Sequence, residues 1–330
     1  MQHKIGEREM IRLLTGIYGA NHKLPLGYDD DIAAIPIFGK NWMILKSDML
    51  VGSTDVPRGM SYRQAARKAI VATVSDFAAK GVRPQALMVS LGLPPTLRRN
   101  DVRQVGYGLA DGSEEYGCRI IGGDTGESRD LTIDCIGAGI TKPSIPVRRS
   151  GARPGDFVAV TGRFGNASAG LRLLLSGRKS IGSFARKLAE AVLQPRARLS
   201  EGVRLAEHKL TSASIDSSDG LAWSLHEIAR CSKVSIGLDS IPIAREAESF
   251  ARQNKISPVE FALYGGEEYE LVVTVKPSLF EKAKQLVPSL IPIGRVGKGR
   301  PRVGASIGGR LVMVEARGWE HFKSRVRFWE

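Results

Sequence analysis

The hydrophobic and polar positions divide the chain into two halves, and each half combines strand-like and helix-like segments. In the first half, the apolar runs Trp42–Leu45 and Ala86–Leu93 and the alternating segment Leu131–Ile140 predict strands. Residues Tyr62–Lys80 have the composition and spacing of a helix, and Gly81 directly after them is suited to end it. The first half is therefore predicted to combine a sheet with helices.

The second half shows the same mixture. Its predicted strands are Phe157–Thr161 and Leu271–Val275, and its predicted helical segments are Leu171–Leu175, Ala185–Leu193 and Leu221–Cys231. Residues 141–156 between the halves hold three prolines and two glycines, which is typical of a connection between domains. We predict α/β and α+β architecture, with one domain over residues 1–145 and a second over residues 146–330.

Length and composition are those of a folded globular protein. The 330 residues are 42% hydrophobic and 25% charged, as in globular proteins. No run approaches the roughly 18 apolar residues that span a bilayer, and the first ten residues lack the apolar core of a secretory signal. Cys118, Cys135 and Cys231 lie far apart without metal-binding spacing, which predicts buried free thiols. We expect a cytoplasmic protein without a membrane partner.

The net charge of +14 leaves several classes of partner open. Such a charge can attract nucleic acid, an anionic membrane or small anionic substrates. The basic residues are spread along the chain, however, and form only modest clusters at Arg148-Arg149, Lys298–Arg302 and Lys323–Arg327. This distribution favours a generally cationic surface over a dedicated nucleic-acid site.

Aspartates stand next to several of the predicted strands. They are Asp29–Asp31, just before the apolar run 32–37, and then Asp48, Asp124, Asp216 and Asp219, each shortly after an apolar run. Because a sheet places its strand ends side by side, these carboxylates are expected to converge. Taken alone, Asp29–Asp31 fit turn or cap residues equally well.

Asp76 differs from the other aspartates because it falls inside a predicted helix. Ala65, Ala69 and Ala72 share its face of the helix, so that a backbone or a ligand can approach closely. The alternative is an ordinary surface ion pair with Lys80, four residues further on.

Clustered carboxylates repel one another unless a hard cation neutralises them. A set of aspartates without His or Cys ligands favours Mg²⁺ over Zn²⁺. Glycines beside acids, in Gly122-Gly123-Asp124-Thr125 and Gly265-Gly266-Glu267-Glu268, would let main-chain N–H groups approach a phosphate. The chain has no P-loop and no strand-linked GxGxxG motif, so it is not a nucleotide enzyme of the common kinds.

The ordered motifs of the chain resemble those of the thiamine-monophosphate kinase family. The match runs from about residue 27 to residue 322 in unbroken order. Its motifs are Asp30-Asp31-Ile-Ala, Ser47-Asp48-Met-Leu-Val51, Val74-Ser-Asp76-Phe-Ala-Ala-Lys-Gly81, Gly122-Gly-Asp124-Thr125, Arg149-Ser-Gly-Ala-Arg-Pro-Gly-Asp156, Asp216-Ser-Ser-Asp219-Gly-Leu221, Gly265-Gly-Glu267-Glu-Tyr-Glu-Leu271 and Gly318-Trp-Glu-His-Phe322.

The resemblance implies the two-domain fold of the aminoimidazole ribonucleotide synthetase superfamily. It implies an N-terminal α/β domain for ATP, Mg²⁺ and homodimerisation, and a C-terminal α+β domain that completes the nucleotide and substrate site. It further implies an ATP-dependent phosphotransferase in thiamine biosynthesis that converts thiamine monophosphate to thiamine diphosphate, with several Mg²⁺ ions.

The resemblance also implies roles for individual residues. The implied metal ligands are Asp30, Ser47, Asp48, Asp76, Asp124, Asp216 and Asp219, and Asp48, Asp76, Asp124 and Asp219 are the implied catalytic residues. The implied nucleotide contacts are Tyr107, Gly123, Asp124, Arg149 and Ser218. The implied substrate contacts are Asp55, Glu267 and Trp319.

The chain departs from the usual family pattern at three places. Asp29 stands where the family commonly has glycine, which leaves open which aspartate of this loop binds metal. Asp55 occupies the position of a histidine near the substrate, and Glu268 replaces the commoner aspartate. Aminoimidazole ribonucleotide synthetase is the nearest alternative, and a basic nucleic-acid-binding protein is a more distant one. The Ser-Asp-Gly-Leu and Gly-Gly-Glu-x-Tyr-Glu-Leu motifs favour the kinase.

Overall fold

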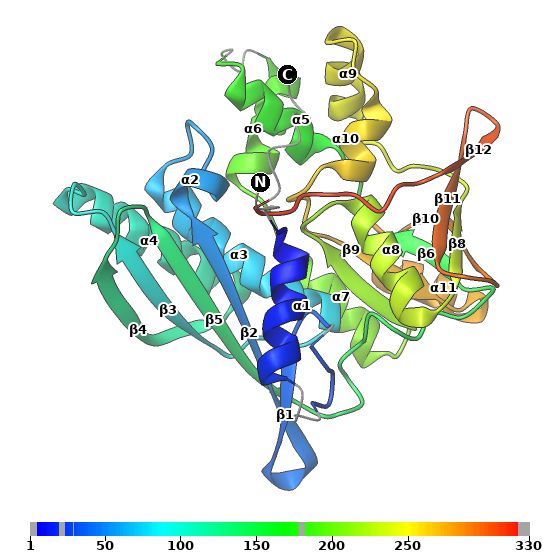
Figure 1. Ribbon diagram of the computed structural model, residues 1–330, viewed down its shortest axis with the longest axis horizontal. Helices are drawn as coiled ribbons and strands as arrows, with labels where there is room; N and C mark the ends of the chain where they lie inside the picture. Colours follow the sequence, from blue (N-terminus) through cyan, green and yellow to red (C-terminus); the bar gives the residue numbers. More distant parts are fainter. Residues whose placement is uncertain (1–4, 20–23, 29, 178–181, 323–330) are drawn as a thin grey trace.

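The two halves of the chain build two separate sheets with helices around them (Figure 1). The structure is a computed structural model that describes residues 5–19, 24–28, 30–177 and 182–322. The first half lies on the left of Figure 1 and the second half on the right. This mixed architecture of helices and two sheets confirms the predicted fold class.

The first sheet has five strands in the order β1-β2-β5-β3-β4. The strands β3 and β4 pair in parallel, and the other neighbours pair antiparallel. The elements of this half are α1 (Glu7–Tyr18), β1 (Ala33–Ile37), the short 3₁₀ helix η1 (Phe38–Lys40), β2 (Asn41–Val51), α2 (Gly52–Asp55), α3 (Tyr62–Lys80), β3 (Ala86–Leu93), α4 (Arg99–Tyr116), β4 (Arg119–Glu127) and β5 (Thr132–Thr141).

The second sheet has seven strands in the order β12-β11-β8-β10-β6-β9-β7. Only its pair β11 and β8 runs parallel among the described residues. The elements of this half are β6 (Phe157–Val160), α5 (Asn166–Leu175), α6 (Ser183–Leu193), α7 (Leu199–Glu207), β7 (Ala213–Ser217), α8 (Leu221–Ser232), β8 (Ser235–Leu238), α9 (Arg245–Gln253), α10 (Pro258–Tyr264), β9 (Glu270–Val275), α11 (Pro277–Leu286), β10 (Ile291–Gly297), β11 (Arg302–Ile307) and β12 (Arg310–Met313).

The central helix α3 has the bounds that the sequence predicts. The Ser61 side chain accepts a hydrogen bond from the Gln64 N–H, and the Gln64 side chain accepts one from the Ser61 N–H. Both backbone N–H groups at the start of the helix therefore have a partner. The helix ends at Gly81, whose φ of 68° is the left-handed conformation that glycine adopts at little cost. A Cβ at this position would also lie 2.0 Å from the Cβ of Ala206 on α7.

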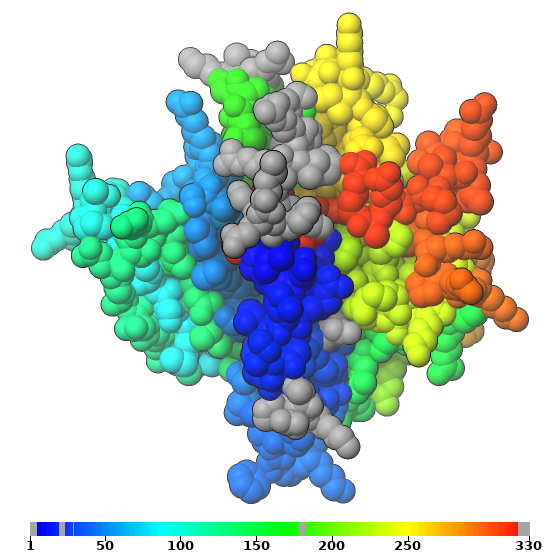
Figure 2. Space-filling view, viewed as in Figure 1, coloured from blue at the N-terminus to red at the C-terminus, as the bar shows by residue number. Residues whose placement is uncertain are grey.

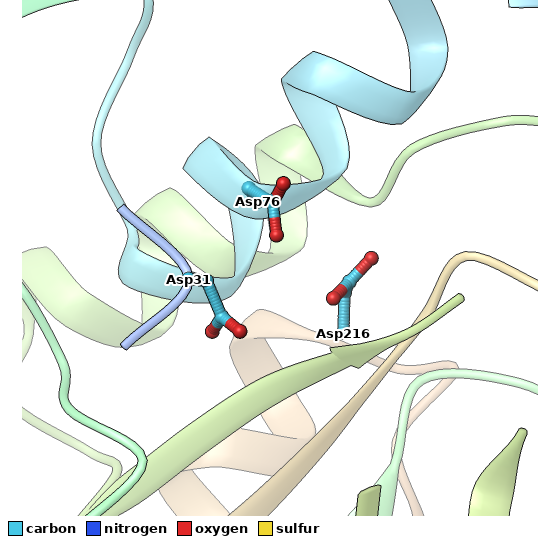
Figure 3. A group of neighbouring side chains, drawn as sticks. All are labelled: Asp31, Asp76 and Asp216. Atoms are coloured by element: carbon cyan, nitrogen blue, oxygen red, sulfur yellow. The ribbon is translucent and has the colours of Figure 1, made fainter. Parts of the chain in front are cut away.

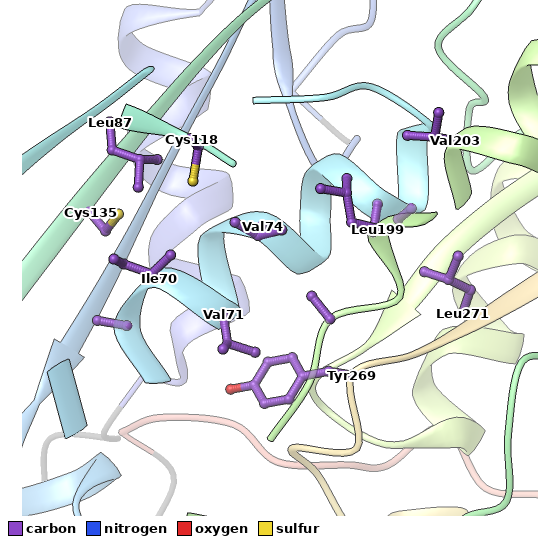
Figure 4. Close-up of a cluster of buried hydrophobic side chains, with 14 of the residues drawn as sticks. Ile70, Val71, Val74, Leu87, Cys118, Cys135, Leu199, Val203, Tyr269 and Leu271 are labelled. Atoms are coloured by element: carbon purple, nitrogen blue, oxygen red, sulfur yellow. The ribbon is translucent and has the colours of Figure 1, made fainter. Parts of the chain in front are cut away.

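One hydrophobic core runs through α3 and joins the two halves. Its buried residues include Val74 on α3, Leu87 and Cys135 on the first sheet, and Leu199 and Leu271 from the second half (Figure 4). Helix α3 is buried on nearly all sides, and its buried residues include charged ones such as Lys68, Asp76 and Lys80. The carboxylate of Asp76 is therefore carried by the most deeply buried helix of the described structure.

The connection between the sheets and the first helix complete the description. Residues 142–156 contain no helix or strand, as predicted for a linker, while the exact domain boundary stays a prediction. Helix α1 lies across the junction of the two halves in the space-filling view (Figure 2).

Cys118 and Cys135 are buried free thiols as predicted, and Cys231 is half-buried. Among the described residues, no helix is long and apolar enough to cross a membrane.

Candidate active site

Three buried aspartates from distant parts of the sequence meet at the junction of the two halves. Asp31 lies in the loop before β1, Asp76 on α3 and Asp216 on β7, and their side chains point toward one another (Figure 3). One carboxylate oxygen of each lies within 4.8 Å of one from each of the others. The expected convergence of carboxylates therefore occurs, and α3 contributes to it from its interior.

The burial of these carboxylates makes their negative charges costly. Desolvation raises the pKa of Asp76 well above its ordinary value, and the nearby carboxylates of Asp216 and Asp48 raise it further against the effect of Lys46. Desolvation likewise raises the pKa of Asp216 to about 7. Burial alone would also raise the pKa of Asp31, but Arg149 and Lys80 together hold it below the ordinary value. Repulsion of this kind is what a bound cation would relieve.

Two lysines supply positive charge to the cluster, each through a different pair of carboxylates. The Lys46 Nζ lies 2.7 Å from Asp76 Oδ2 and 3.5 Å from Asp48 Oδ2. The fully buried Lys80 Nζ lies 2.6 Å from both Asp30 Oδ1 and Asp31 Oδ2. The alternative Asp76–Lys80 pair is therefore wrong, because each of the two side chains pairs with residues of other segments.

Arg149, an implied nucleotide contact, belongs to the same cluster. Its guanidinium group donates two hydrogen bonds to Asp31 Oδ1, and its Nη1 lies 3.4 Å from Glu227 Oε2 on α8. Its backbone N–H also points to Asp30, at 3.4 Å. Asp30 and Asp31 are thus both engaged by cations of the chain, whereas Asp29 lies outside the described residues.

Three aspartates that the sequence placed after strands lie within strands instead. Asp48 is inside β2, Asp124 inside β4 and Asp216 inside β7, because each strand continues beyond the apolar run that predicted it. Strand alternation then separates neighbours: Asp48 faces the side covered by α3, and Ser47 faces the opposite side, where its hydroxyl donates to Asp134 at 2.6 Å.

Asp124 and its neighbours lie apart from the buried cluster. Strand register places Asp48 opposite Cys135, Cys135 opposite Val89, and Val89 opposite Gly123. Because strands are spaced by about 4.8 Å, Asp124 lies roughly 14 Å from Asp48 across the sheet. Residues 122–125 lie inside strand β4, which is exposed throughout, and the approach of their N–H groups to a phosphate stays a prediction.

Tyr107 and Gly123 also lie away from the buried cluster. Tyr107 is half-exposed on α4, where the Arg63 guanidinium lies 5.8 Å from its ring. Gly123 is packed so closely that a Cβ would lie 1.8 Å from the carbonyl oxygen of Val89. This glycine therefore serves close strand packing within the described chain.

The predicted substrate residues Asp55 and Glu267 meet at Lys68 on α3. The Lys68 Nζ donates to the backbone oxygen of Asp55 at 2.8 Å and also to a carboxylate oxygen of Glu267. Asp55 Oδ1 lies 4.0 Å from His321 Nε2, and Asp55 Oδ2 accepts the Val51 N–H. A histidine thus stands beside Asp55, although it comes from the end of the described chain rather than from position 55.

Backbone contacts fix the segment that carries Glu267 and the segment that carries Trp319. The Glu267 N–H donates to the oxygen of Ser218 at 2.7 Å, and the Trp319 N–H donates to the oxygen of Asp219 at 2.9 Å. Glu267 adopts a left-handed φ of 64°, which a non-glycine residue keeps only when its surroundings enforce it. The segment 265–268, in which the sequence places glycines beside acidic residues, is therefore held against the end of β7.

Arg8 connects the first helix to this end of the site. Its Nη2 lies 3.6 Å from Asp219 Oδ2, its Nη1 lies 3.0 Å from Glu320 Oε2, and its guanidinium lies 3.2 Å from the ring centre of Trp223. Desolvation raises the pKa of Asp219 to about 6, and Arg8 opposes this effect. Helix α1 is thus fastened to an implied metal ligand.

Sequence reasoning did not identify Arg8, Lys46 or Lys68 as residues of the site. Lys46 stands two residues before Asp48 in a strand, and this spacing alone places both side chains on one face. Lys68 lies eight residues before Asp76 on the same helix, close to two full turns. These spacings could have identified both lysines, whereas nothing in the sequence indicates the position of Arg8.

Glu268 provides a test of the electrostatics beside the site. Its Oε1 accepts the N–H groups of Gly165 and Ala167 at 2.6 and 3.1 Å, while burial raises its pKa to about 8. Between pH 4.5 and about 8 the folded protein therefore holds a proton that the unfolded chain releases, so stability falls as pH rises through this window.

Replacing Glu268 by glutamine keeps the acceptor oxygen and removes the titration. From about pH 5 to pH 8 we expect the free energy of unfolding of the unaltered chain to fall by about 1–3 kcal/mol more than that of Glu268→Gln. Denaturant unfolding at several pH values measures this difference. Parallel pH profiles of the two proteins would contradict it.

Comparison with known proteins agrees with this architecture. The family model "AIR synthase related protein, N-terminal domain" matches residues 29–141. The thiamine-monophosphate kinase of Nitrosopumilus maritimus is 33% identical over 97% of this chain and 99% of its own length. That of Pyrococcus horikoshii is 36% identical over 97% of each chain. The solved structure "AaThiL complexed with AMPPCP and TMP" superposes with a TM-score of 0.84 at 30% identity, over 96% of this chain and 97% of that one.

The two-sheet fold and the match to the family model define a protein of the AIR synthase-related class. Within this class, identity above 30% along nearly the whole chain decides the assignment. The chain belongs to the thiamine-monophosphate kinase family, which confirms the resemblance found in the sequence. The same comparisons disfavour aminoimidazole ribonucleotide synthetase and a nucleic-acid-binding protein as alternatives.

Proposed function

We propose that the chain transfers the terminal phosphoryl group of ATP to thiamine monophosphate and so makes thiamine diphosphate. The observation that carries this proposal is the convergence of Asp31, Asp76 and Asp216 in a chain of this family. The relative solved with AMPPCP and TMP holds an ATP analogue together with the acceptor, which supports the same pair of substrates here.

The donor set of the cluster fits Mg²⁺. The three converging side chains offer carboxylate oxygens, and no described His or Cys joins them. Bound Mg²⁺ would neutralise these carboxylates and the phosphates of both substrates. We propose the ligands Asp30, Ser47, Asp48, Asp76, Asp124, Asp216 and Asp219, with Asp31 as a further candidate.

Each half of the chain contributes its own contacts in this proposal. The nucleotide contacts are Tyr107, Gly123, Asp124, Arg149 and Ser218, and the substrate contacts are Asp55, Glu267 and Trp319. Asp124 lies about 14 Å from Asp48 and, in register with Ser90, on the opposite face of the sheet, so a metal held by Asp124 would be separate from one held by Asp48. The domain limits at residues 145 and 146 and the cytoplasmic location stay predictions.

The chemistry requires positioning and charge compensation more than proton transfer. The acceptor is a phosphate monoester that is already ionised near neutral pH, so no general base has to activate it. The barrier is the approach of two polyanions in line. Arg149 offers a fixed positive charge that the buried Asp31 orients through two hydrogen bonds.

One assay tests this function. The pure chain is incubated with ATP and Mg²⁺ and, separately, with thiamine, thiamine monophosphate or formylglycinamidine ribonucleotide. Thiamine diphosphate should appear from the monophosphate alone and should disappear when EDTA removes the metal. Turnover of formylglycinamidine ribonucleotide instead would show that the function is wrong. Label from γ-³²P-ATP on the protein without acceptor would contradict direct transfer.

We further propose a homodimer through the uncovered face of the first sheet. Helix α3 covers one face, and the other presents Met49, Met88 and Ile140 with exposed fractions of 62%, 47% and 46%. An apolar face of this kind is typical of an interaction surface. A second copy of the chain is the partner that the family resemblance implies.

Met88→Asp is expected to weaken the dimer at least about tenfold, because it would bury an unpaired charge at this face. Light scattering after size-exclusion chromatography over a range of concentrations measures this change. The matched control is Leu311→Asp on β12, where the side chain is 80% exposed in the other half. A monomeric unaltered chain, or an unchanged dimer in Met88→Asp, would contradict the proposed interface.

A further inference from the structure

Lys46 lies among carboxylates that are proposed to bind metal. Its ammonium group lies between two proposed metal ligands, 2.7 Å from Asp76 Oδ2 and 3.5 Å from Asp48 Oδ2. The side chain starts on β2 and faces the same side as Asp48, because residues two apart in a strand share a face. The charge of Asp31 also reaches it. A single positive charge thus stands among the carboxylates that a metal would bind.

Lys80 shows what a purely structural lysine looks like in this molecule. Its side chain is fully buried and its ammonium is held by Asp30, Asp31 and the backbone oxygen of Ser214. Both lysines hold carboxylates that are proposed to bind metal, but Lys46 differs in two respects: its side chain is 23% exposed, and among the described residues its polar contacts are carboxylates without a backbone oxygen. A divalent cation at the proposed site would bind both of these carboxylates, those of Asp48 and Asp76.

We propose that Lys46 is a catalytic residue whose ammonium leaves Asp48 and Asp76 when a divalent cation binds and then contacts the phosphoryl group being transferred. The inference rests on the proposed function. Metal binding removes its two partners, and the substrates bring phosphate oxygens into the same space. A lysine binds phosphate as a flexible point charge on a four-carbon stem, so it can follow a group that moves between two anions.

The arrangement has a second consequence that does not depend on turnover. While Lys46 holds Asp48 and Asp76, it competes with Mg²⁺ for the same oxygens. Without the ammonium, the metal-free site keeps its carboxylates but loses their compensating charge. A variant without this charge should therefore be less stable without metal and should bind Mg²⁺ more tightly.

The test uses Lys46→Met, Lys46→Arg and the control Lys187→Met, whose lysine pairs with Glu246 at an exposed site. Mg²⁺ affinity without nucleotide is measured by calorimetry and by the rise of Tm with Mg²⁺, and kcat and KM are measured at saturating metal. For Lys46→Met we expect Mg²⁺ to bind about tenfold more tightly and kcat to fall about 100-fold, with KM for ATP nearly unchanged. Lys46→Arg should recover part of kcat, and Lys187→Met should match the unaltered chain.

Two results would overturn the role of Lys46. One is a kcat of Lys46→Met within about threefold of the unaltered chain. The other is a loss of kcat with unchanged Mg²⁺ affinity and a lowered Tm at saturating Mg²⁺, which would show a structural ion pair like that of Lys80. Failure of the proposed function is separate, because it would appear as the absence of thiamine diphosphate with the unaltered chain.

Discussion

Asp76→Asn is expected to lower kcat by at least about 10³-fold and to leave the fold intact. Asp76 belongs to the buried cluster and has a carboxylate oxygen within 4.8 Å of oxygens from Asp31 and Asp216. An amide cannot supply the negative charge that holds a metal against two polyanionic substrates. The fold should survive, because desolvation and the neighbouring carboxylates already disfavour a charge at this position. Steady-state kinetics at saturating Mg²⁺, together with Tm without metal, measure both effects.

The control for this prediction is Asp111→Asn, which removes the carboxylate on α4 from an exposed ion pair with Arg63 on α3. Its kcat should stay within about twofold of the unaltered chain, since exposed pairs contribute little. Asp48→Asn and Asp124→Asn should lose turnover as Asp76→Asn does. Near-normal activity in any two of the three variants would contradict the proposed metal ligands.

The helix that carries Asp76 could be predicted from the sequence because its signals are local. The cap at Ser61, the alanine-rich body and Gly81 lie within one stretch and determine its two ends. Strand β3 was predicted for the same reason, as a continuous apolar run over Ala86–Leu93. The short strands at residues 291–313 were not predicted, because their pairing with β8 and β6 is set by distant segments.

The strands at the site extend further along the chain than their apolar runs predict. β2 continues through Asp48 to Val51, and β4 continues through Gly122 and Gly123, although polar residues and glycines usually weaken a strand. Ladder pairing with β5 and β3 overrides those preferences. The consequence is chemical as well as geometric, because alternation then directs neighbouring side chains to opposite faces.

The acidic residues of the site were easier to predict than the basic ones. The aspartates can be recognised in the sequence because they recur near predicted strands. The cations that compensate them are common surface residues in a chain with a charge of +14, so composition does not distinguish them. Lys80 is the clearest example, since it stands four residues from Asp76 on one helix and yet pairs with Asp30 and Asp31.

Lys80→Met is expected to lower the free energy of unfolding by about 3–5 kcal/mol, because it leaves buried carboxylates without their cation. The Lys80 side chain is fully buried, and those of Asp30 and Asp31 are 6% and 0% exposed. Its ammonium also binds the backbone oxygen of Ser214 at 2.8 Å, so the same substitution frees an acceptor at the start of β7. Arg149 remains on Asp31 and limits the loss. Denaturant unfolding without metal measures the effect.

A second substitution shows whether Lys80→Met loses stability through the missing positive charge or through altered packing. Asp30→Asn in the Lys80→Met background should recover part of the stability, since it removes one of the two carboxylates that Lys80 pairs with, and the recovery is measured as a double-mutant cycle. Lys187→Met, which breaks an exposed pair with Glu246, should cost less than about 1 kcal/mol. A cost for Lys80→Met as small as that of the control would mean that Asp30 and Asp31 do not depend on Lys80. In that case the two aspartates would be free to bind metal without competition, and Lys80 would not couple the loop before β1 to β7.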